Sequence, residues 1–507
     1  MANVRVLIDG DRLALNEVVA AARKYTTVAL TPRAKKRMER SRRWVEGAVR
    51  SHEIVYGITT GFGAFQNISI PTQQLRDLQR NLILSHCVGV GEPLPEDVVR
   101  AMMLLRANAL AKGASGIRVA TVERLLEMLN KRVHPIVPAQ GSVGASGDLA
   151  PLSHIAAVLI GEGEAIYKGR RMSGRAALKA ARIQPVILEA KEGLALNNGT
   201  QAMTAIGVLV LYDAEHLADV ADIVAAMSLE AVKGKSTPFD ARVHRLRPHA
   251  GQATVAKNIR SLIKGSTLVD AVDADTENKV QDSYSIRCVP QVHGASRDAL
   301  THVRSVLEKE INSATDNPLI FPDDDDALSA GNFHGQPVAL VMDYLALAVA
   351  ELGCISERRT AKLMDRHHNS GLPAFLATQG GVQSGFMIAQ YTAAALVSEN
   401  KVLIHPASGD SIPTSANQED HVSMGTIAAR QAAMIVENVR RVLAIELLCA
   451  AQALDVRKRG FGNGSATVLK SLRRVVRSLK QDRYLSRDIE SAAEFIRSRF
   501  LESVLKR

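Results

Sequence analysis

Gly141-Ser142-Val143-Gly144-Ala145-Ser146-Gly147-Asp148 is the most informative stretch of this 507-residue chain. Its three glycines, at a spacing of three, surround an Ala-Ser-Gly triplet and allow the backbone to turn tightly. We expect the Gly147 amide nitrogen to approach the Ala145 carbonyl carbon closely enough to close a five-membered ring. Loss of two waters, one of them from Ser146, would leave an exocyclic methylidene, which is an electrophile. A side chain at position 147 would block that approach.

Other interpretations of this stretch must be weighed against ring formation. A run rich in glycine, serine and alanine is most often an ordinary loop. A nucleophile elbow requires G-x-S-x-G after a strand, and a dinucleotide-binding loop requires G-x-G-x-x-G between a strand and a helix. The stretch has neither pattern, so an ordinary loop is the alternative that the remaining motifs must overturn.

Composition indicates a large helical protein. Aromatic residues make up only 4% of the chain, with a single tryptophan at position 44, while alanine and leucine are abundant. The four cysteines are scattered without metal or redox spacing, so we expect reduced thiols in a cytoplasmic protein and no metal site. The most apolar long stretch, 337–354, contains Asp343 and Glu351 and therefore predicts a buried helix rather than a membrane span.

The net charge of +11 raises the possibility of a nucleic-acid partner. Residues 455–507 contain 14 Lys+Arg and 6 Asp+Glu, a net of +8 (14 − 6), spaced among valine, leucine and isoleucine as on a helix. No nucleic-acid motif is present among them. A solvated helical face is the better interpretation, and we expect neither nucleic acid nor membrane as a partner.

Hydrophobic periodicity predicts a mainly α protein with a long central helical bundle and a small mixed α/β N-terminal region that carries the glycine-rich loop. We place the domains at 1–198 and 199–507. Strands are expected at 5–9, 27–30 and 164–172, and a hairpin with an acidic tip at 319–333. Helices are expected at 72–88, 95–112, 119–131, 200–229, 296–313, 336–365, 384–403 and 421–454.

Short polar segments interrupt the apolar helices, and several lie at predicted helix starts, where side chains converge. They are Tyr56-Gly57-Ile58-Thr59-Thr60-Gly61-Phe62-Gly63, 81–86, Asn197-Asn198-Gly199-Thr200, Gln281-Asp282-Ser283-Tyr284-Ser285-Ile286-Arg287, Gly331-Asn332-Phe333-His334-Gly335 and Asn417-Gln418-Glu419-Asp420-His421.

In order and spacing, the loop and these segments resemble the aromatic amino acid ammonia-lyase and aminomutase family, over about residues 56–428. The resemblance implies that Ala145-Ser146-Gly147 forms a 4-methylidene-imidazol-5-one group (MIO) autocatalytically, with no external cofactor. It also implies a homotetramer whose active sites each draw residues from three subunits, an arrangement that suits helices too apolar for a monomer to cover.

The resemblance assigns roles to individual residues. Tyr56 is expected to remove the β-proton of an amino acid substrate, with a pKa lowered from its usual value near 10 by the surrounding dipoles and cations. Arg287 is suited to hold the substrate carboxylate. Tyr284 and Asn198 are expected to orient the electrophile and the amine, with Gln281 supporting their network. Phe333 is expected to pack against the prosthetic group or the substrate ring.

Substrate choice depends on fewer positions. Ser85-His86 and Glu419 resemble the histidine-selective members of the family, and an imidazole with a carboxylate could satisfy both ring nitrogens of a buried histidine. The expected reaction converts L-histidine to trans-urocanate and ammonia. Action on phenylalanine or tyrosine, as a lyase or a 2,3-aminomutase, remains the alternative. Four departures from the histidine-selective pattern keep it open: Thr59, Asn197, Glu277 and His293. An inactive scaffold that retains only the fold is a third hypothesis.

Overall fold

The computed structural model describes residues 5–505, so the extreme ends of both predicted domains lie outside the described residues. The chain divides into two compact units. The first unit comprises the chain up to Leu209 together with Arg304–Asp343 and Pro406–Arg430, and the second comprises Val210–Val303, Tyr344–His405 and the chain from Gln431 onward. This division differs from the predicted boundary at 198/199, because two later segments return to the first unit.

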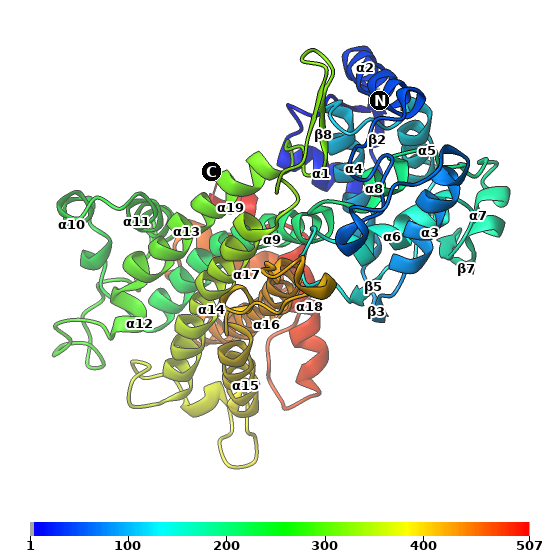
Figure 1. Cartoon of the computed structure of the whole chain (residues 1–507). Coiled ribbons are helices and arrows are strands. Elements are labelled where there is room, and N and C mark those ends of the chain that lie inside the picture. Colours follow the sequence, from blue (N-terminus) through cyan, green and yellow to red (C-terminus); the bar gives the residue numbers. More distant parts are fainter. Residues whose placement is uncertain (1–4, 506–507) are drawn as a thin grey trace. The chain divides into compact units, whose positions relative to one another are not determined.

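The first unit is the mixed α/β part of the molecule (Figure 1). Its strands form small sheets: β1 (Arg5–Ile8) runs parallel to β2 (Thr27–Leu30), β3 (Val90–Pro93) pairs with β5 (Pro138–Gln140), β4 (Val133–Pro135) with β6 (Glu164–Tyr167) and β7 (Arg170–Ser173), and β8 (Leu319–Phe321) with β9 (Asp326–Leu328). These strands confirm the expected ones, including the hairpin with its acidic tip.

The first unit also contains several helices, and the glycine-rich loop leads into one of them. They are α1 (Leu15–Arg23), α2 (Pro32–Ser51), α3 (Leu75–His86), α4 (Glu96–Ala111), α5 (Val119–Asn130), α6 (Leu149–Leu159), α7 (Gly174–Ala180) and α8 (Glu192–Asn197). Helix α4 is buried all round from Val98 to Ala111. Helix α2 was not expected from periodicity; it begins at a Thr31 cap, whose hydroxyl accepts from the Ala34 amide, with Pro32 in the first turn.

The second unit contains most of the long-helix bundle. Its helices are α9 (Gln201–Ala231), α10 (Ala241–Leu246), α11 (Ala250–Leu262), α12 (Tyr284–Arg287), α13 (Val289–Glu310), α14 (Gln336–Met364), α15 (Met387–Leu403), α16 (Gly425–Arg457), α17 (Asn463–Leu472), α18 (Leu485–Arg497) and α19 (Glu502–Leu505). The chain passes between the units within α9, α13, α14 and α16. The expected helices are therefore confirmed, and α13 begins earlier than predicted.

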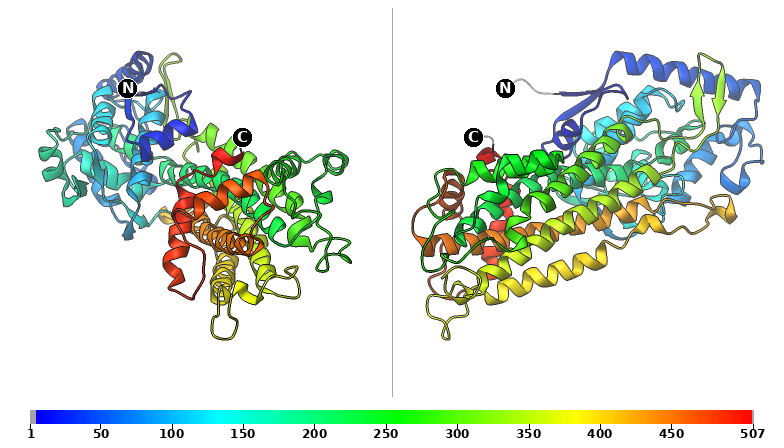
Figure 2. Two further views of the ribbon diagram at one scale, coloured as in Figure 1. Left: turned by 180° about the vertical axis from the view of Figure 1, so that it is seen from behind. Right: turned by 90° about the vertical axis from the view of Figure 1, so that its left-hand side faces the viewer.

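A buried polar network joins α9, α13, α14 and α16 in the second unit, and these long helices run alongside one another in Figure 2. Arg359 of α14 makes a two-point ion pair with Glu446 of α16, at 2.6 and 2.8 Å. Ser228 of α9 also donates to Glu446, at 2.6 Å. His293 of α13 is fully buried, and its Nδ1 lies 2.8 Å from the Asp222 carboxylate. The unusual histidine at position 293 is thus a satisfied core residue.

Helix α14 is long and apolar enough to cross a membrane by length and composition. In its most apolar window 67% of the residues are buried inside the protein, as in a core helix.

Candidate active site

The glycine-rich loop lies between β5 and α6 and is held in a tight turn. Gly147 has φ +72°, in the left-handed region that favours glycine. Gly199 packs directly against it: the Gly199 amide donates to the Ser146 carbonyl at 3.2 Å, and the Asp148 amide donates to the Gly199 carbonyl at 2.7 Å. A Cβ at position 147 would lie 2.2 Å from the Gly199 carbonyl carbon. The expected need for glycine at 147 is therefore confirmed.

Asp148 follows the triplet and is fully buried. Its Oδ2 accepts from the amides of Ala202 and Met203, both at 2.9 Å, at the start of α9. Its Oδ1 accepts from Ser142 Oγ at 3.0 Å and from the hydroxyl of Thr426. Burial raises the pKa of Asp148, although these donors act against the rise. The carboxyl thus connects the loop to two long helices.

The returning segment 406–430 also bonds to the loop. The Met424 amide donates to the Val143 carbonyl at 2.8 Å. Ser423 Oγ donates to the Gly144 carbonyl at 3.1 Å. Residues nearly 280 positions apart in sequence therefore determine the conformation of the loop.

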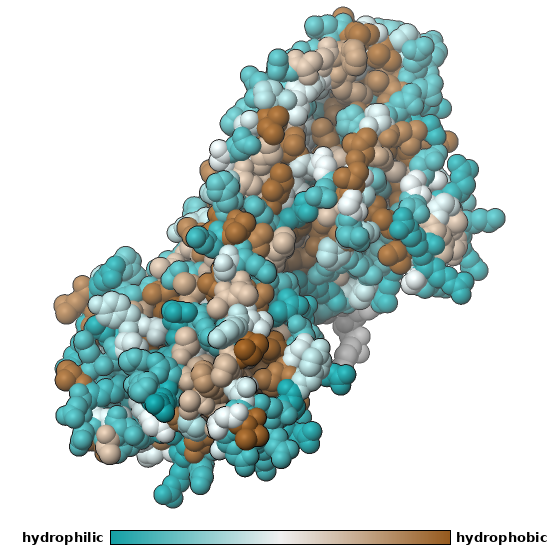
Figure 3. Space-filling model, turned by 90° about the horizontal axis from the view of Figure 1, so that it is seen from below, coloured by the Kyte–Doolittle hydropathy of each residue, from teal (hydrophilic) through white to brown (hydrophobic). Residues whose placement is uncertain are grey.

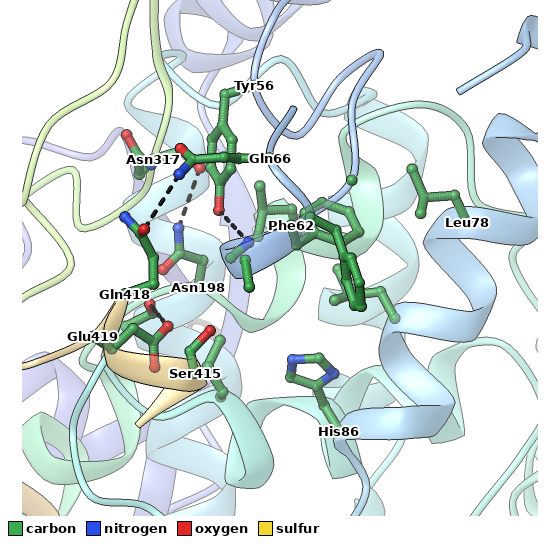
Figure 4. A pocket seen from close by; sticks show the side chains of 18 of the residues that line it. Tyr56, Phe62, Gln66, Leu78, His86, Asn198, Asn317, Ser415, Gln418 and Glu419 are labelled. Atoms are coloured by element: carbon green, nitrogen blue, oxygen red, sulfur yellow. Dashed lines mark hydrogen bonds between the residues drawn. The ribbon is translucent and has the colours of Figure 1, made fainter. Parts of the chain in front are cut away.

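A pocket of about 990 Å³ opens beside the loop within the first unit. Figure 4 shows side chains that line it. It includes these predicted site residues: Tyr56, His86, Ser146, Asn198, Phe333 and Glu419. Much of the remaining wall is apolar, with Phe62, Phe65, Ile68, Ile70, Leu78, Leu82, Leu149 and Leu194. A cavity of this size with a few convergent polar groups is typical of a small-molecule site.

Glu419 lines the pocket, and each of its carboxyl oxygens accepts a side-chain hydrogen bond. Ser146 Oγ donates to its Oε1 at 3.1 Å, and Thr414 Oγ1 donates to its Oε2 at 2.9 Å. His86, at the end of α3, also lines the pocket, with its Nδ1 3.1 Å from Ser85 Oγ. Burial lowers the pKa of His86, and the charge of Glu419 partly opposes that shift. A neutral imidazole beside a carboxylate can donate and accept hydrogen bonds with a polar ring.

Tyr56 is partly buried, and its hydroxyl accepts from the Gly63 amide at 3.3 Å. Burial raises the pKa of Tyr56; the Gly63 hydrogen bond lowers it and the charge of Glu419 raises it. The expected downward shift of this pKa is therefore wrong for the single chain. The physical reason is that the tyrosine is desolvated next to an anion rather than a cation.

Buried polar and charged groups hold Asn198 in place. Its side-chain amide donates to the Asn317 carbonyl at 3.2 Å and to Asp316 Oδ1 at 3.3 Å. The backbone carbonyl of Asn198 accepts from Arg106 Nη1 at 2.7 Å. Arg106 is itself fully buried, and this burial lowers its pKa to about 10. Asn198 Oδ1 is buried without a hydrogen-bond partner among the described residues, which leaves an acceptor available beside the pocket.

Three predicted site residues lie elsewhere. Gln281, Tyr284 and Arg287 belong to the second unit and do not line this pocket. Tyr284 is 70% exposed, and the Arg287 guanidinium lies 4.6 Å from the centre of its ring. The structure thus brings together the predicted residues of the first unit and leaves these three exposed or partly exposed on the second.

Sequence reasoning missed several residues that shape the site. Thr414 and Thr426 hold carboxyl groups, and their hydroxyls carry no distinguishing sequence signal. Gln66, which lies just beyond the predicted segment 56–63, donates from its Nε2 to Gln418 Oε1 at 3.2 Å (Figure 4). Thr59, one of the four departures, is buried and bonds to the backbone of residues 53 and 55, outside the pocket lining.

Comparison with known proteins shows what the chain as a whole is similar to. A family model described as aromatic amino acid lyase matches residues 13–477. A histidine ammonia-lyase of Alkaliphilus oremlandii is 55% identical over 505 residues, which are 99% of each chain. A crystal structure of histidine ammonia-lyase from Trypanosoma cruzi superimposes with a TM-score of 0.92 at 43% identity, covering 99% of this chain and 95% of that one. Tyrosine aminomutase from Streptomyces globisporus gives a TM-score of 0.95 at 40% identity, covering 99% of both.

Proposed function

The chain belongs to the aromatic amino acid lyase family, and from that premise we propose that it eliminates ammonia from L-histidine to give trans-urocanate. It is then a carbon–nitrogen lyase of histidine degradation. The observation that carries the substrate assignment is the pocket that His86, Ser146 and Glu419 line together, with Glu419 bonded to Ser146. Whole-length similarity to histidine ammonia-lyases supports the same assignment.

Ala145-Ser146-Gly147 fits the requirements of an MIO precursor. The site admits no Cβ at position 147, the triplet backbone is pinned by Gly199, and the Ser146 hydroxyl faces the pocket. When formed, MIO supplies an electrophile that takes up the substrate amine and makes it a better leaving group. No external cofactor is needed for this chemistry.

The chain's own residues bind the substrate and move its protons. Asn198 offers an unpartnered buried acceptor for an ammonium or amide donor. Tyr56 lies in the same pocket and is the proposed base for the β-proton. The raised pKa of Tyr56 requires a cation nearby before the phenol can act near neutral pH.

We propose that Gln281, Tyr284 and Arg287 reach the pocket from neighbouring subunits of a homotetramer. Arg287 would supply the missing cation and hold the substrate carboxylate, and its Nε is buried without a hydrogen-bond partner among the described residues. Exposed apolar side chains on α14 and α15 within the second unit support association: Tyr344, Leu347, Ile388, Tyr391 and Val402. Figure 3 shows hydrophobic residues scattered among hydrophilic ones on one face.

Glu419 and His86 determine the substrate in this proposal. An imidazole ring presents one donor and one acceptor, and a site built to pair both rejects rings that lack them. Phe333 lines the same pocket and would pack against the substrate ring or the electrophile. We place the enzyme in the cytoplasm, where its four free cysteines stay reduced.

Product analysis tests the proposed reaction. Purified protein is incubated separately with L-histidine, L-phenylalanine and L-tyrosine, and the products are followed by ultraviolet absorbance and chromatography. We expect urocanate and ammonia from histidine, and no product when Ser146→Ala replaces the wild type. Cinnamate or coumarate as the main product would indicate a lyase of phenylalanine or tyrosine, and a β-amino acid would indicate an aminomutase. The similarity to tyrosine aminomutase is the reason for including these substrates.

A further inference from the structure

The carboxyl group of Glu419 is held rigidly before any substrate is present. Thr414 and Glu419 face each other as an antiparallel bridge, in which the Thr414 amide donates to the Glu419 carbonyl at 2.8 Å and the Glu419 amide donates back at 3.2 Å. The Thr414 hydroxyl then fixes one carboxyl oxygen at 2.9 Å. Backbone and side chain together therefore leave the other oxygen, Oε1, aimed at one place.

That place is the hydroxyl of Ser146, at 3.1 Å. Maturation of the triplet removes this hydroxyl. The Ser146 Cβ–Oγ bond breaks, the proton on its Cα leaves, the two electrons of the C–H bond form the exocyclic double bond, and the hydroxyl and the proton depart as one water. The atom that leaves is thus the atom that Glu419 contacts.

We propose that Glu419, positioned by Thr414, assists the loss of the Ser146 hydroxyl and so acts in maturation before it acts on substrate. Its carboxylate holds the Cβ–Oγ bond in one of three staggered rotamers. It then takes up the proton that leaves Ser146 Cα and passes it to the departing oxygen. Once the water has left, Oε1 has lost its serine donor and can accept a substrate N–H. The inference rests on the proposed function, because it concerns the ring that the function requires.

The size of the effect follows from these two contributions. Fixing one rotamer of three is worth up to about threefold in rate. Proton transfer assistance by a placed group is worth about 10²-fold or more. We therefore expect dehydration of Ser146 to slow by about threefold if orientation alone matters, and by 10²-fold or more if Glu419 also transfers the proton.

Mass spectrometry measures maturation without any activity assay. Protein is produced in a short pulse, samples are denatured at intervals, and tryptic peptide 133–168, which contains the triplet, is weighed. The wild-type peptide should lose two waters, about 36 Da in all. Glu419→Ala and Thr414→Val should instead accumulate peptide that has lost one water, about 18 Da, or none.

Paired variants separate the possible roles. Glu419→Gln keeps an acceptor for Ser146 but cannot relay a proton, so its rate should fall between those of wild type and Glu419→Ala only if orientation contributes. Thr414→Ser restores the hydroxyl and should restore the rate. Thr254→Val, at an exposed threonine of α11 that bonds only to the backbone of its own helix, is the matched control and should mature normally.

Folding is checked by far-ultraviolet circular dichroism and by elution volume. If wild-type, Glu419→Ala and Thr414→Val peptides lose both waters at one rate, Glu419 has no part in maturation and only this inference fails. If the wild-type peptide keeps its full mass, the proposed function itself fails and takes the inference with it. If Glu419→Ala does not fold, the comparison of Thr414→Val with Thr414→Ser decides the question.

Discussion

Replacing Gly147 with alanine tests the loop geometry most directly. Two glycines of the first unit share a left-handed conformation, with φ +72° at Gly147 and +75° at Gly169. They differ in surroundings: an alanine Cβ at 147 would lie 2.2 Å from the Gly199 carbonyl carbon, whereas at 169, in the turn between β6 and β7, nothing lies within 4 Å. Gly169→Ala is therefore a matched control for backbone strain.

The expected losses can be worked from these contacts. Alanine in the left-handed region costs about 1–2 kcal/mol, and both variants should show this loss. Gly147→Ala must also push Gly199 away, which breaks two backbone hydrogen bonds, at 3.2 and 2.7 Å. Each is worth about 0.5–1.5 kcal/mol net, so we expect a further loss of about 1–3 kcal/mol in this variant alone.

The single tryptophan makes the measurement specific. Trp44 belongs to the first unit, where its Nε1 donates to Asp325 at 2.8 Å, so its fluorescence reports the unfolding of the unit that contains both glycines. Urea titration gives the free energy of unfolding for each variant. The tryptic peptide of Gly147→Ala should also keep its full mass, and that of Gly169→Ala should lose two waters. Equal stability of the two variants, or a normally dehydrated Gly147→Ala peptide, would refute the reasoning.

Four further predictions concern the pocket and its surroundings. Tyr56→Phe should lower kcat by about 10²- to 10⁴-fold, while the peptide still loses both waters. Glu419→Gln should lower kcat/KM for histidine by about 10- to 100-fold, which is the worth of a hydrogen bond to a charged group. Unchanged steady-state kinetics would contradict either role. Tyr56→Phe and Arg287→Ala, each nearly inactive alone, should regain about a quarter of wild-type activity when co-expressed, because one site in four receives both intact residues if they come from different subunits, and no recovery would place both in one chain. Burial raises the pKa of Asp148 above 3.8, so the stabilising contribution of its protonated form is complete below that pH and is lost as pH rises through the folded pKa. The free energy of unfolding of Asp148→Asn relative to wild type, measured in urea from pH 4 upward, should therefore increase with pH. A constant difference would show that this carboxyl does not titrate with folding.

The helical architecture could be predicted because its strongest signal is local. Apolar runs such as 200–229 and 421–454 exceed what one helix face requires, and both are long helices. Helix α2 escaped prediction because arginine and lysine dominate it and its buried face is narrow. Helix α13 begins at Val289 rather than 296 because Pro290 lies in its first turn, where it is tolerated, and because His293 is buried against Asp222.

The site could be predicted only as far as its motifs extend. Tyr56, His86 and Glu419 lie in polar segments that interrupt apolar runs, and the structure brings them into one pocket. The hydroxyls that hold the carboxyls could not be found this way, because a threonine acquires such a role only from contacts with distant residues. In the single chain the pKa of Tyr56 shifts against the prediction because it depends on the neighbours of the phenol, where burial and the charge of Glu419 both raise it.

The ribosome makes the glycine-rich loop long before it makes the segment that bonds to the loop. Thr426, which bonds to Asp148, follows it by 278 residues, and Ser423 and Met424 reach the loop from the same late segment. At about 5–20 residues per second, translation needs about 15–60 s to cover that interval. The triplet of a growing polypeptide therefore lacks these contacts through most of its synthesis, and we expect the proposed ring to close only when the polypeptide is nearly finished.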